Sequence, residues 1–314
     1  MTLLSEIVLV VLPVFVVIGL GYSLRMTGLV DKTFLFQLNR LIYYVALPAL
    51  LFYKIATADF SASFNPRLLA GMVLSVTVIF VSSLFYTRLM NYPAKTQGAF
   101  CQSSFRGNLA YIGLAIAYNA YGAAGFAIAG ILLGFLVPLF NFLAVIALLL
   151  PQQDSAHKLG RSFWAYQVAF NPLIIASFVG IVWSFLGVTV PLVLDRSLDI
   201  LTGMSLPLAL ITIGASFSPK KLQGEMVITL SATFIKVALM PTLTALILLF
   251  FGVSGRELAV GVILAGTPTA TAAYIMAQQL NADAELSGAI IMMTTLVSVF
   301  SYSLMLFILR LYGV

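Results

Sequence analysis

Charged residues, cysteine and histidine are all scarce in this chain of 314 residues. Only 8% of the residues are Asp, Glu, Lys or Arg, against about 25% in soluble domains. A water-soluble fold of this length would form roughly two domains, each with a polar surface to cover. Ten acidic and sixteen basic residues cannot cover that surface. The low charge therefore excludes an ordinary soluble protein.

The scarcity of reactive side chains excludes several chemistries. A single cysteine, Cys101, excludes an intramolecular disulfide and cysteine-rich metal sites. The only histidine, His157, lies in a polar loop, which excludes histidine-based zinc motifs. An intramembrane enzyme would need carboxylate pairs, a Ser–His dyad or metal ligands inside its apolar segments, and the sequence has none there. We therefore predict no enzyme and no cofactor.

Apolar residues dominate what is present. They make up 61% of the chain, and the mean hydropathy is +1.09. Short basic loops explain the net charge of +6, so no nucleic-acid partner is needed. Because a bilayer-spanning helix needs about 20 apolar residues, the sequence predicts an all-α membrane protein with ten transmembrane helices. Their predicted residues are 7–24, 38–57, 68–90, 98–118, 125–149, 163–186, 198–217, 226–250, 257–280 and 287–309.

Ten spans place both termini on the same face of the membrane. Lys and Arg in the predicted loops number nine on one face and five on the other. Because cytoplasmic loops carry the excess of basic residues, we predict that both termini lie on the outer side.

The two halves of the chain resemble each other. At a shift of 159 residues, Gly28 falls on Gly187 and Pro48 on Pro207, and the order of the spans also corresponds. Five spans per half is an odd number, so the second half must enter from the opposite face, as in many secondary transporters. The predicted parts are a first five-helix repeat over residues 1–150, a short cytoplasmic linker over 151–161, and a second, inverted five-helix repeat over 162–314.

Prolines and small residues inside the spans bear on helix packing. Pro48 and Pro207 are predicted to kink their helices as structural hinges. Gly130 and Gly134 form a Gly-xxx-Gly pattern. This pattern leaves open a homodimer contact or close packing within one chain.

The fourth and ninth spans are the most polar, and we predict that both are broken. Pro268 lacks an amide hydrogen, which frees backbone groups of the ninth helix. Gly107 and Asn108 tolerate non-helical dihedrals in the fourth. Two broken helices that meet near the midplane would present half-helix N-termini, which attract anions. The alternative is a simple proline kink whose free carbonyls bind threonine hydroxyls.

Two cations are predicted at mid-depth. Arg106 and Lys236 each lie about 13–15 Å into their spans, where a charge costs about 2.5–3.5 kcal/mol. No Asp or Glu lies deep in any predicted span, which favours an anionic substrate and disfavours a sodium/proton antiporter. For Lys236, snorkelling or hydrogen bonding to carbonyls freed near Pro241 remains an equal alternative.

These observations predict one binding site. A carboxylate is expected to dock between the broken helices, with charge from Arg106 and hydrogen bonds from Asn108, Thr267 and Thr269. The predicted substrate-binding residues are Arg106, Gly107, Asn108, Lys236, Thr267, Pro268 and Thr269.

Several motifs occur along the whole chain in the order of a known family. They are Leu38-Asn39-Arg40, Leu47-Pro48-Ala49-Leu50-Leu51-Phe52, Arg106-Gly107-Asn108-Leu109-Ala110-Tyr111-Ile112-Gly113-Leu114, Leu206-Pro207 through Ala215, Lys236 to Pro241, and Gly266-Thr267-Pro268. On these motifs the chain resembles the auxin efflux carrier family in its bacterial branch, which includes malate and malonate permeases.

The resemblance implies a fold and a motion. Ten helices would form two inverted repeats, with the fourth and ninth crossing at their breaks. Helices one, two, six and seven would form a scaffold, and the others would form a unit that moves in an elevator-like way. The family's crossover asparagine and proline fall on Asn108 and Pro268. Ala115 departs from the pattern, because family members often have a proline there.

The predicted function is secondary active transport of a small organic anion, a carboxylate, across a bacterial cytoplasmic (inner) membrane. The predicted partners are this anion and the lipid bilayer. The alternatives are an ion-coupled carrier of a bile-acid-like or neutral solute, or a channel.

Overall fold

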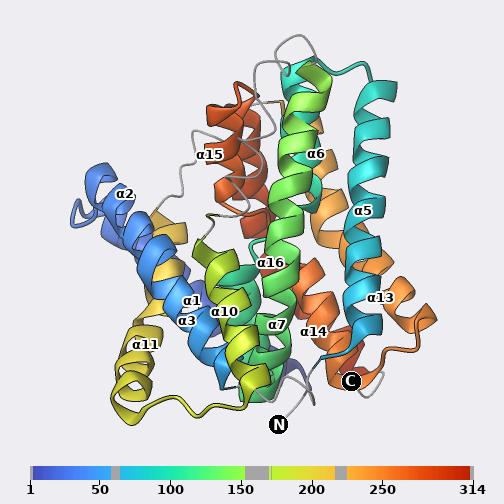
Figure 1. Cartoon of the computed structure of the whole chain (residues 1–314). Helices are drawn as coiled ribbons and strands as arrows, with labels where there is room; N and C mark the ends of the chain where they lie inside the picture. Colours follow the sequence, from blue (N-terminus) through green and yellow to red (C-terminus); the bar gives the residue numbers. More distant parts are fainter. Residues whose placement is uncertain (1–2, 58–63, 153–169, 171, 216–224, 312–314) are drawn as a thin grey trace. The chain divides into compact units, whose positions relative to one another are not determined.

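The chain is all-helical, as predicted. The computed structural model describes residues 3–57, 64–152, 170, 172–215 and 225–311 (Figure 1). Over these residues there is no strand, only one isolated antiparallel bridge. The elements are α1 (Leu3–Met26), α2 (Lys32–Leu41), η1 (Ile42–Ala46), α3 (Leu47–Ala56), α5 (Pro66–Leu89), α6 (Ala94–Phe105), η2 (Leu109–Gly113), α7 (Leu114–Leu149), η3 (Leu150–Gln152), α10 (Pro172–Leu186), α11 (Leu192–Ala215), α12 (Met226–Phe234), η5 (Ile235–Leu239), α13 (Met240–Phe250), α14 (Gly255–Ala265), α15 (Ala272–Gln279) and α16 (Ala284–Leu311).

Six helical runs among the described residues are long and apolar enough to cross a membrane. The number is below ten because some predicted spans are interrupted or only partly described. The ninth, for example, is divided between α14 and α15. The run over residues 109–152 counts once although Gly122, with φ 62° and ψ −152°, breaks its helical geometry. The ten-span arrangement therefore remains a prediction.

Most helix boundaries lie within a few residues of the predicted ones, with two clear differences. The second predicted span begins at Lys32, the start of α2, rather than at residue 38. α11 begins at Leu192, directly after Pro191, rather than at residue 198. The predicted spans leave residues 187–197 as a loop, and this segment carries Asp195 and Arg196. Proline is favoured at the start of a helix, and acidic residues stabilise a first turn, so the helix extends through this polar stretch. The predicted linker from residue 153 onward and the start of the sixth span lie outside the described residues.

The helices group into two compact units that do not coincide with the sequence halves. Unit 1 comprises residues 1–65, 110–137 and 168–217, and unit 2 comprises residues 66–109, 138–167 and 218–314. Each unit takes segments from both halves of the chain, and α7 belongs to unit 1 up to Val137 and to unit 2 from Pro138.

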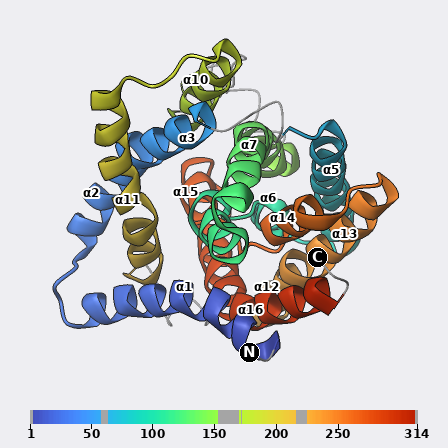
Figure 2. The same ribbon diagram turned by 90° about the horizontal axis from the view of Figure 1, so that it is seen from below.

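Close backbone contact joins two helices of unit 1. α1 packs on α11, and a Cβ added at Gly21 or Gly214 would overlap the backbone carbonyl of Ile211 or Ile18, respectively. α3 lies beside α10 and also contacts α11, as both ribbon views show (Figures 1 and 2).

The two predicted hinge prolines lie in the helices α3 and α11 of unit 1. Pro48 follows the π-helical turn η1, in which the amide of Leu47 reaches back to the carbonyl of Ile42. Pro207 lies inside α11, and Ser205 Oγ donates to the carbonyl of Ala46 at 2.9 Å. Their role as hinges remains a prediction.

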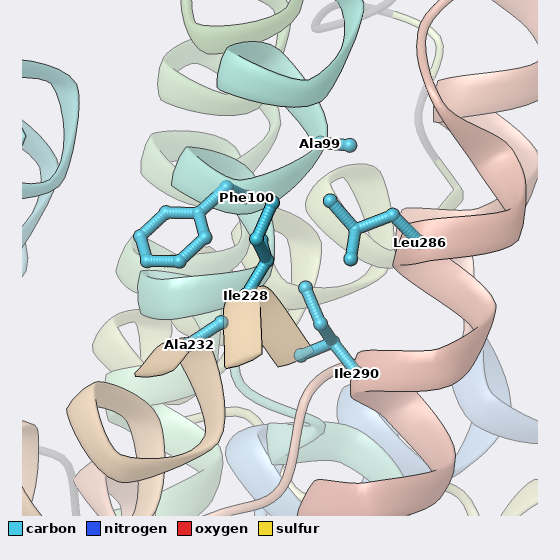
Figure 3. Packing of buried hydrophobic residues seen from close by; sticks show 6 residues of the cluster. All are labelled: Ala99, Phe100, Ile228, Ala232, Leu286 and Ile290. Atoms are coloured by element: carbon cyan, nitrogen blue, oxygen red, sulfur yellow. The ribbon is translucent and has the colours of Figure 1, made fainter. Parts of the chain in front are cut away.

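A hydrophobic core joins three helices of unit 2. It is formed by Ala99 and Phe100 of α6, Ile228 and Ala232 of α12, and Leu286 and Ile290 of α16 (Figure 3). α6 also packs on α5 and α15. This packing holds the end of α6, where the candidate site begins.

Candidate functional site: the crossover of two broken helices

Two helices of unit 2 are broken where the sequence predicts it. α6 ends at Phe105, Arg106 has extended dihedrals (φ −76°, ψ 95°), and helical geometry resumes only at Leu109. α14 ends at Ala265, and α15 begins at Ala272. Pro268, which cannot donate a backbone hydrogen bond, lies within this second break. We call residues 106–108 and 266–271 the crossover.

The two non-helical segments pair with each other in antiparallel fashion. Gly107 and Thr269 form an isolated β-bridge. The backbone N–H of Asn108 donates to the backbone carbonyl of Pro268 at 2.8 Å. The backbone N–H of Ala270 donates to the backbone carbonyl of Arg106 at 2.9 Å. Each break therefore satisfies backbone groups that the other leaves free, which is what an interrupted helix in lipid requires.

The two threonines of the crossover donate to backbone carbonyls. Thr269 Oγ1 donates to the carbonyl of Ser103 at 2.7 Å, and Thr267 Oγ1 donates to that of Leu264 at 2.7 Å. The amide of Thr269 donates in turn to Thr294 Oγ1 at 3.1 Å. Since each hydroxyl has one hydrogen and it is used, these side chains stabilise the crossover and retain only acceptor lone pairs for a ligand.

Arg106 is nearly buried, with 8% of its surface exposed. Its Nη2 donates to Asn141 Oδ1 at 2.6 Å, and its Nη1 lies 2.8 Å from Met276 Sδ. These partners come from α7 and α15, so three elements meet at the guanidinium. The sequence analysis did not identify either partner. The sequence feature that could have indicated Asn141 is its position as a polar side chain inside an apolar span.

Lys236 is fully buried in η5, close to the end of α14. Its Nζ donates to the carbonyl of Ala265 at 2.6 Å and lies 3.4 Å from Met240 Sδ. Hydrogen bonding to a freed carbonyl is thus observed, but the carbonyl belongs to the break in α14 and not to the region of Pro241. A cation at this end of a helix is stabilised by the helix dipole.

The two ends of the break between α14 and α15 differ in accessibility. Ala265, which ends α14, is buried. By contrast, Thr271 and Ala272 at the start of α15 are half-buried. The accessible end is therefore a helix N-terminus, whose backbone N–H groups and positive dipole favour anions.

Several polar groups beside the crossover lack partners among the described residues. Gln102 Nε2 donates to the carbonyl of Ala273 at 2.9 Å, but Gln102 Oε1 and Ser103 Oγ are buried and have no hydrogen-bond partner. Buried polar groups in native proteins are rarely left unsatisfied. Gln102 Oε1 and Ser103 Oγ, both on α6, are thus available to hydrogen-bond a further group beside the crossover.

The crossover brings six of the seven predicted substrate-binding residues together, and Lys236 joins them through the carbonyl of Ala265. Within the described residues, no group of three or more His, Cys, Asp or Glu side chains could hold a metal ion.

Sequence comparisons identify the family of the chain. The family described as "Membrane transport protein" matches residues 6–163 and 152–306. The chain belongs to this family, that of the auxin efflux carriers. It is therefore a multi-pass membrane transporter and not an enzyme.

Three relatives of this transporter are each similar to it over more than nine-tenths of the chain. It is 30% identical to "Putative malonate transporter" of Rhizobium meliloti (strain 1021), over 98% of this chain and 97% of the relative. It is 24% identical to an uncharacterized transporter of Methanocaldococcus jannaschii, over 91% and 93% of the two chains. An uncharacterized transporter of Methanothermobacter thermautotrophicus is 23% identical, over 94% and 95%.

Proposed function

We propose that the chain is a secondary active transporter that binds a small carboxylate at the crossover and moves it by alternating access. The observation that carries this proposal is the arrangement at the two breaks. The half-buried N-terminus of α15 and the guanidinium of Arg106 belong to the same crossover. Helix N-termini and arginine both recognise carboxylates, the first through backbone amides and the second through paired N–H groups.

The choice of first substrate comes from a relative. One protein covering nearly the whole chain is named as a malonate transporter, so malonate is the first anion to test. Its two carboxylates suit a site that offers more than one group of donors.

The inverted repeat is supported by backbone conformation. Gly28 and Gly187, 159 positions apart, both have positive φ values of 80° and 64°. Gly122 and Asn281, also 159 positions apart, have φ values of 62° and 54°. Positive φ values are confined to a few turn and break positions in most proteins, so a shared spacing of positive-φ positions favours duplication of one ancestral unit. The antiparallel bridge between the two breaks suits copies of opposite direction.

The elevator-like motion is supported by the division into units. α1, α2, α3, α10 and α11, which correspond to the first, second, sixth and seventh predicted spans, all fall in unit 1. The whole crossover falls in unit 2. Residues 110–137, expected in the mobile part, group with unit 1 instead. A binding site confined to one of two compact units is what movement of that unit as a rigid body requires.

The proposal is tested by Arg106→Gln in proteoliposomes. The variant keeps a polar side chain but loses the charge and most of the donors, so saturable uptake of radiolabelled malonate is expected to fall to background. Arg256→Gln, at an exposed position in the first turn of α14, is the matched control and should transport normally. Thermal stabilisation of the detergent-purified protein by malonate should disappear in Arg106→Gln alone.

The same assay separates a carrier from a channel. A carrier loaded with malonate inside accelerates entry of labelled malonate, whereas a channel does not. Undiminished uptake by Arg106→Gln would overturn the assignment of the anion site to the crossover.

A further inference from the structure

Asn141 is a polar side chain of α7 to which neither the sequence motifs nor the comparisons assign a role. It is half-buried, and its Oδ1 accepts the 2.6 Å hydrogen bond from Arg106 Nη2. Polar side chains inside apolar spans are costly and mark functional positions when they face other polar groups. The partner here is the cation that the proposed function places at the anion site.

The chemistry of the two side chains fixes how Asn141 is oriented. A guanidinium has only donors, so the amide oxygen must face it. The amide nitrogen of Asn141, with two N–H donors, then has no acceptor among the described residues. Because the side chain is only half-buried, these donors are not sealed in the core.

Met276 Sδ accepts a hydrogen bond from the other terminal nitrogen of the guanidinium, Arg106 Nη1. Met276 lies one turn into α15, whose N-terminal end is half-buried, and its thioether is a neutral acceptor. Asn141 and Met276 thus fix the plane of the guanidinium from α7 and from α15, a geometry that a single carbonyl contact would not provide.

We propose that Asn141 positions Arg106 and donates a second hydrogen bond to the same substrate carboxylate. The inference rests on the proposed function and adds a specificity residue to it. Adjacent N–H groups from a guanidinium and an amide match the two oxygens of one carboxylate. A neutral acceptor against Arg106 also leaves the local field favourable to an incoming anion, which an aspartate would not.

Asn141→Asp is the decisive variant because it changes almost nothing in shape. It retains an oxygen acceptor and strengthens the contact with Arg106, but it removes the N–H donors and adds a negative charge. We expect unchanged or higher thermal stability without substrate, and a half-saturation concentration for radiolabelled malonate raised about ten- to hundred-fold, with the maximal rate changed far less. Asn141→Gln keeps the amide and should restore most of the affinity. Asn119→Asp, the same change at an exposed position of α7, should behave as wild type.

Two results would overturn the assignment. One is a wild-type half-saturation concentration in Asn141→Asp. The other is a loss of stability that parallels the loss of uptake, which would indicate a structural role. If the aspartate variant does not fold, Asn141→Ser takes its place, and an affinity equal to that of Asn141→Gln contradicts the proposal. Failure of the proposed function looks different: the wild type would show no saturable malonate uptake, or Arg106→Gln would transport fully, and both conclusions would then fall together.

Discussion

Gly107 lies where the two non-helical segments are in close contact. A Cβ at this position would overlap Oγ1 of Thr267. That hydroxyl is held in place because it donates to the carbonyl of Leu264. A larger side chain at residue 107 must therefore break this hydrogen bond or separate the bridge with Thr269.

We expect Gly107→Ala to lower the free energy of unfolding by about 1–3 kcal/mol, the usual cost of overpacking a core. Thermal unfolding in detergent would measure this loss, and malonate uptake should fall with it. Gly203→Ala in α11 is the control, since nothing lies within 4 Å of its added Cβ. Equal stability of the two variants would show that the segments are not in close contact.

The residues of the crossover were predictable, but their partners were not. The break at Gly107 and Asn108 follows from local conformational preference, and the break at Pro268 follows from a missing amide hydrogen. The contact between Arg106 and Met276 joins residues 170 positions apart, and no local pattern encodes it. The roles of Thr267 and Thr269 could not be predicted from the sequence either, because a threonine hydroxyl can donate to a ligand or to a nearby backbone carbonyl equally well.

Among the elements, α1 and α11 show how small residues set helix packing. The added Cβ atoms at Gly21 and Gly214 would overlap carbonyl groups of the facing helix. In a membrane, where burial of apolar surface does not drive helix association, such close approach is a main source of stability.

Gly21→Ala and Gly214→Ala should each separate these helices and lower the unfolding temperature. Gly19→Ala in the same helix α1 is the matched control, because its added Cβ meets nothing within 4 Å and alanine favours the helix. Urea or thermal unfolding followed by circular dichroism would measure the three variants. A Gly21→Ala protein as stable as Gly19→Ala would contradict the packing described for unit 1.

Hydropathy located the elements well but placed their ends less accurately. The predicted span 226–250 corresponds to α12, η5 and α13 together, with both ends correct. Hydropathy places the start of α11 too late because Asp195 and Arg196 are charged, whereas Pro191 and Asp195 suit a first helical turn. The π-turns η1, η2 and η5 have no signature in hydropathy, since they change hydrogen bonding without changing polarity.

For the whole molecule, the order of the helices along the sequence does not predict which helices belong to which compact unit. A repeat detected in sequence divides the chain at its middle, whereas the contacts divide it into discontinuous parts. Long-range packing between segments of both halves decides this division. The orientation with both termini outside stays a prediction from the sequence, and the choice between a homodimer contact and packing within one chain at Gly130 and Gly134 stays open.

The central claim is that an anion binds at the accessible N-terminus of α15 in the crossover and that this site faces each side of the membrane in turn. Thr271, half-buried at the start of α15, is the position to probe. The native Cys101 is fully buried, so its background reaction with thiol reagents should be low. Ser254→Cys, at the exposed residue before α14, is the control. It should react with the reagent from one side only, at a rate that malonate does not change.

The measurement is the rate at which a membrane-impermeant maleimide modifies Thr271→Cys in oriented vesicles, applied from either side, with and without malonate. The account predicts reaction from both sides and slowing by malonate on both. Reaction from one side alone, or rates that malonate leaves unchanged, would contradict it.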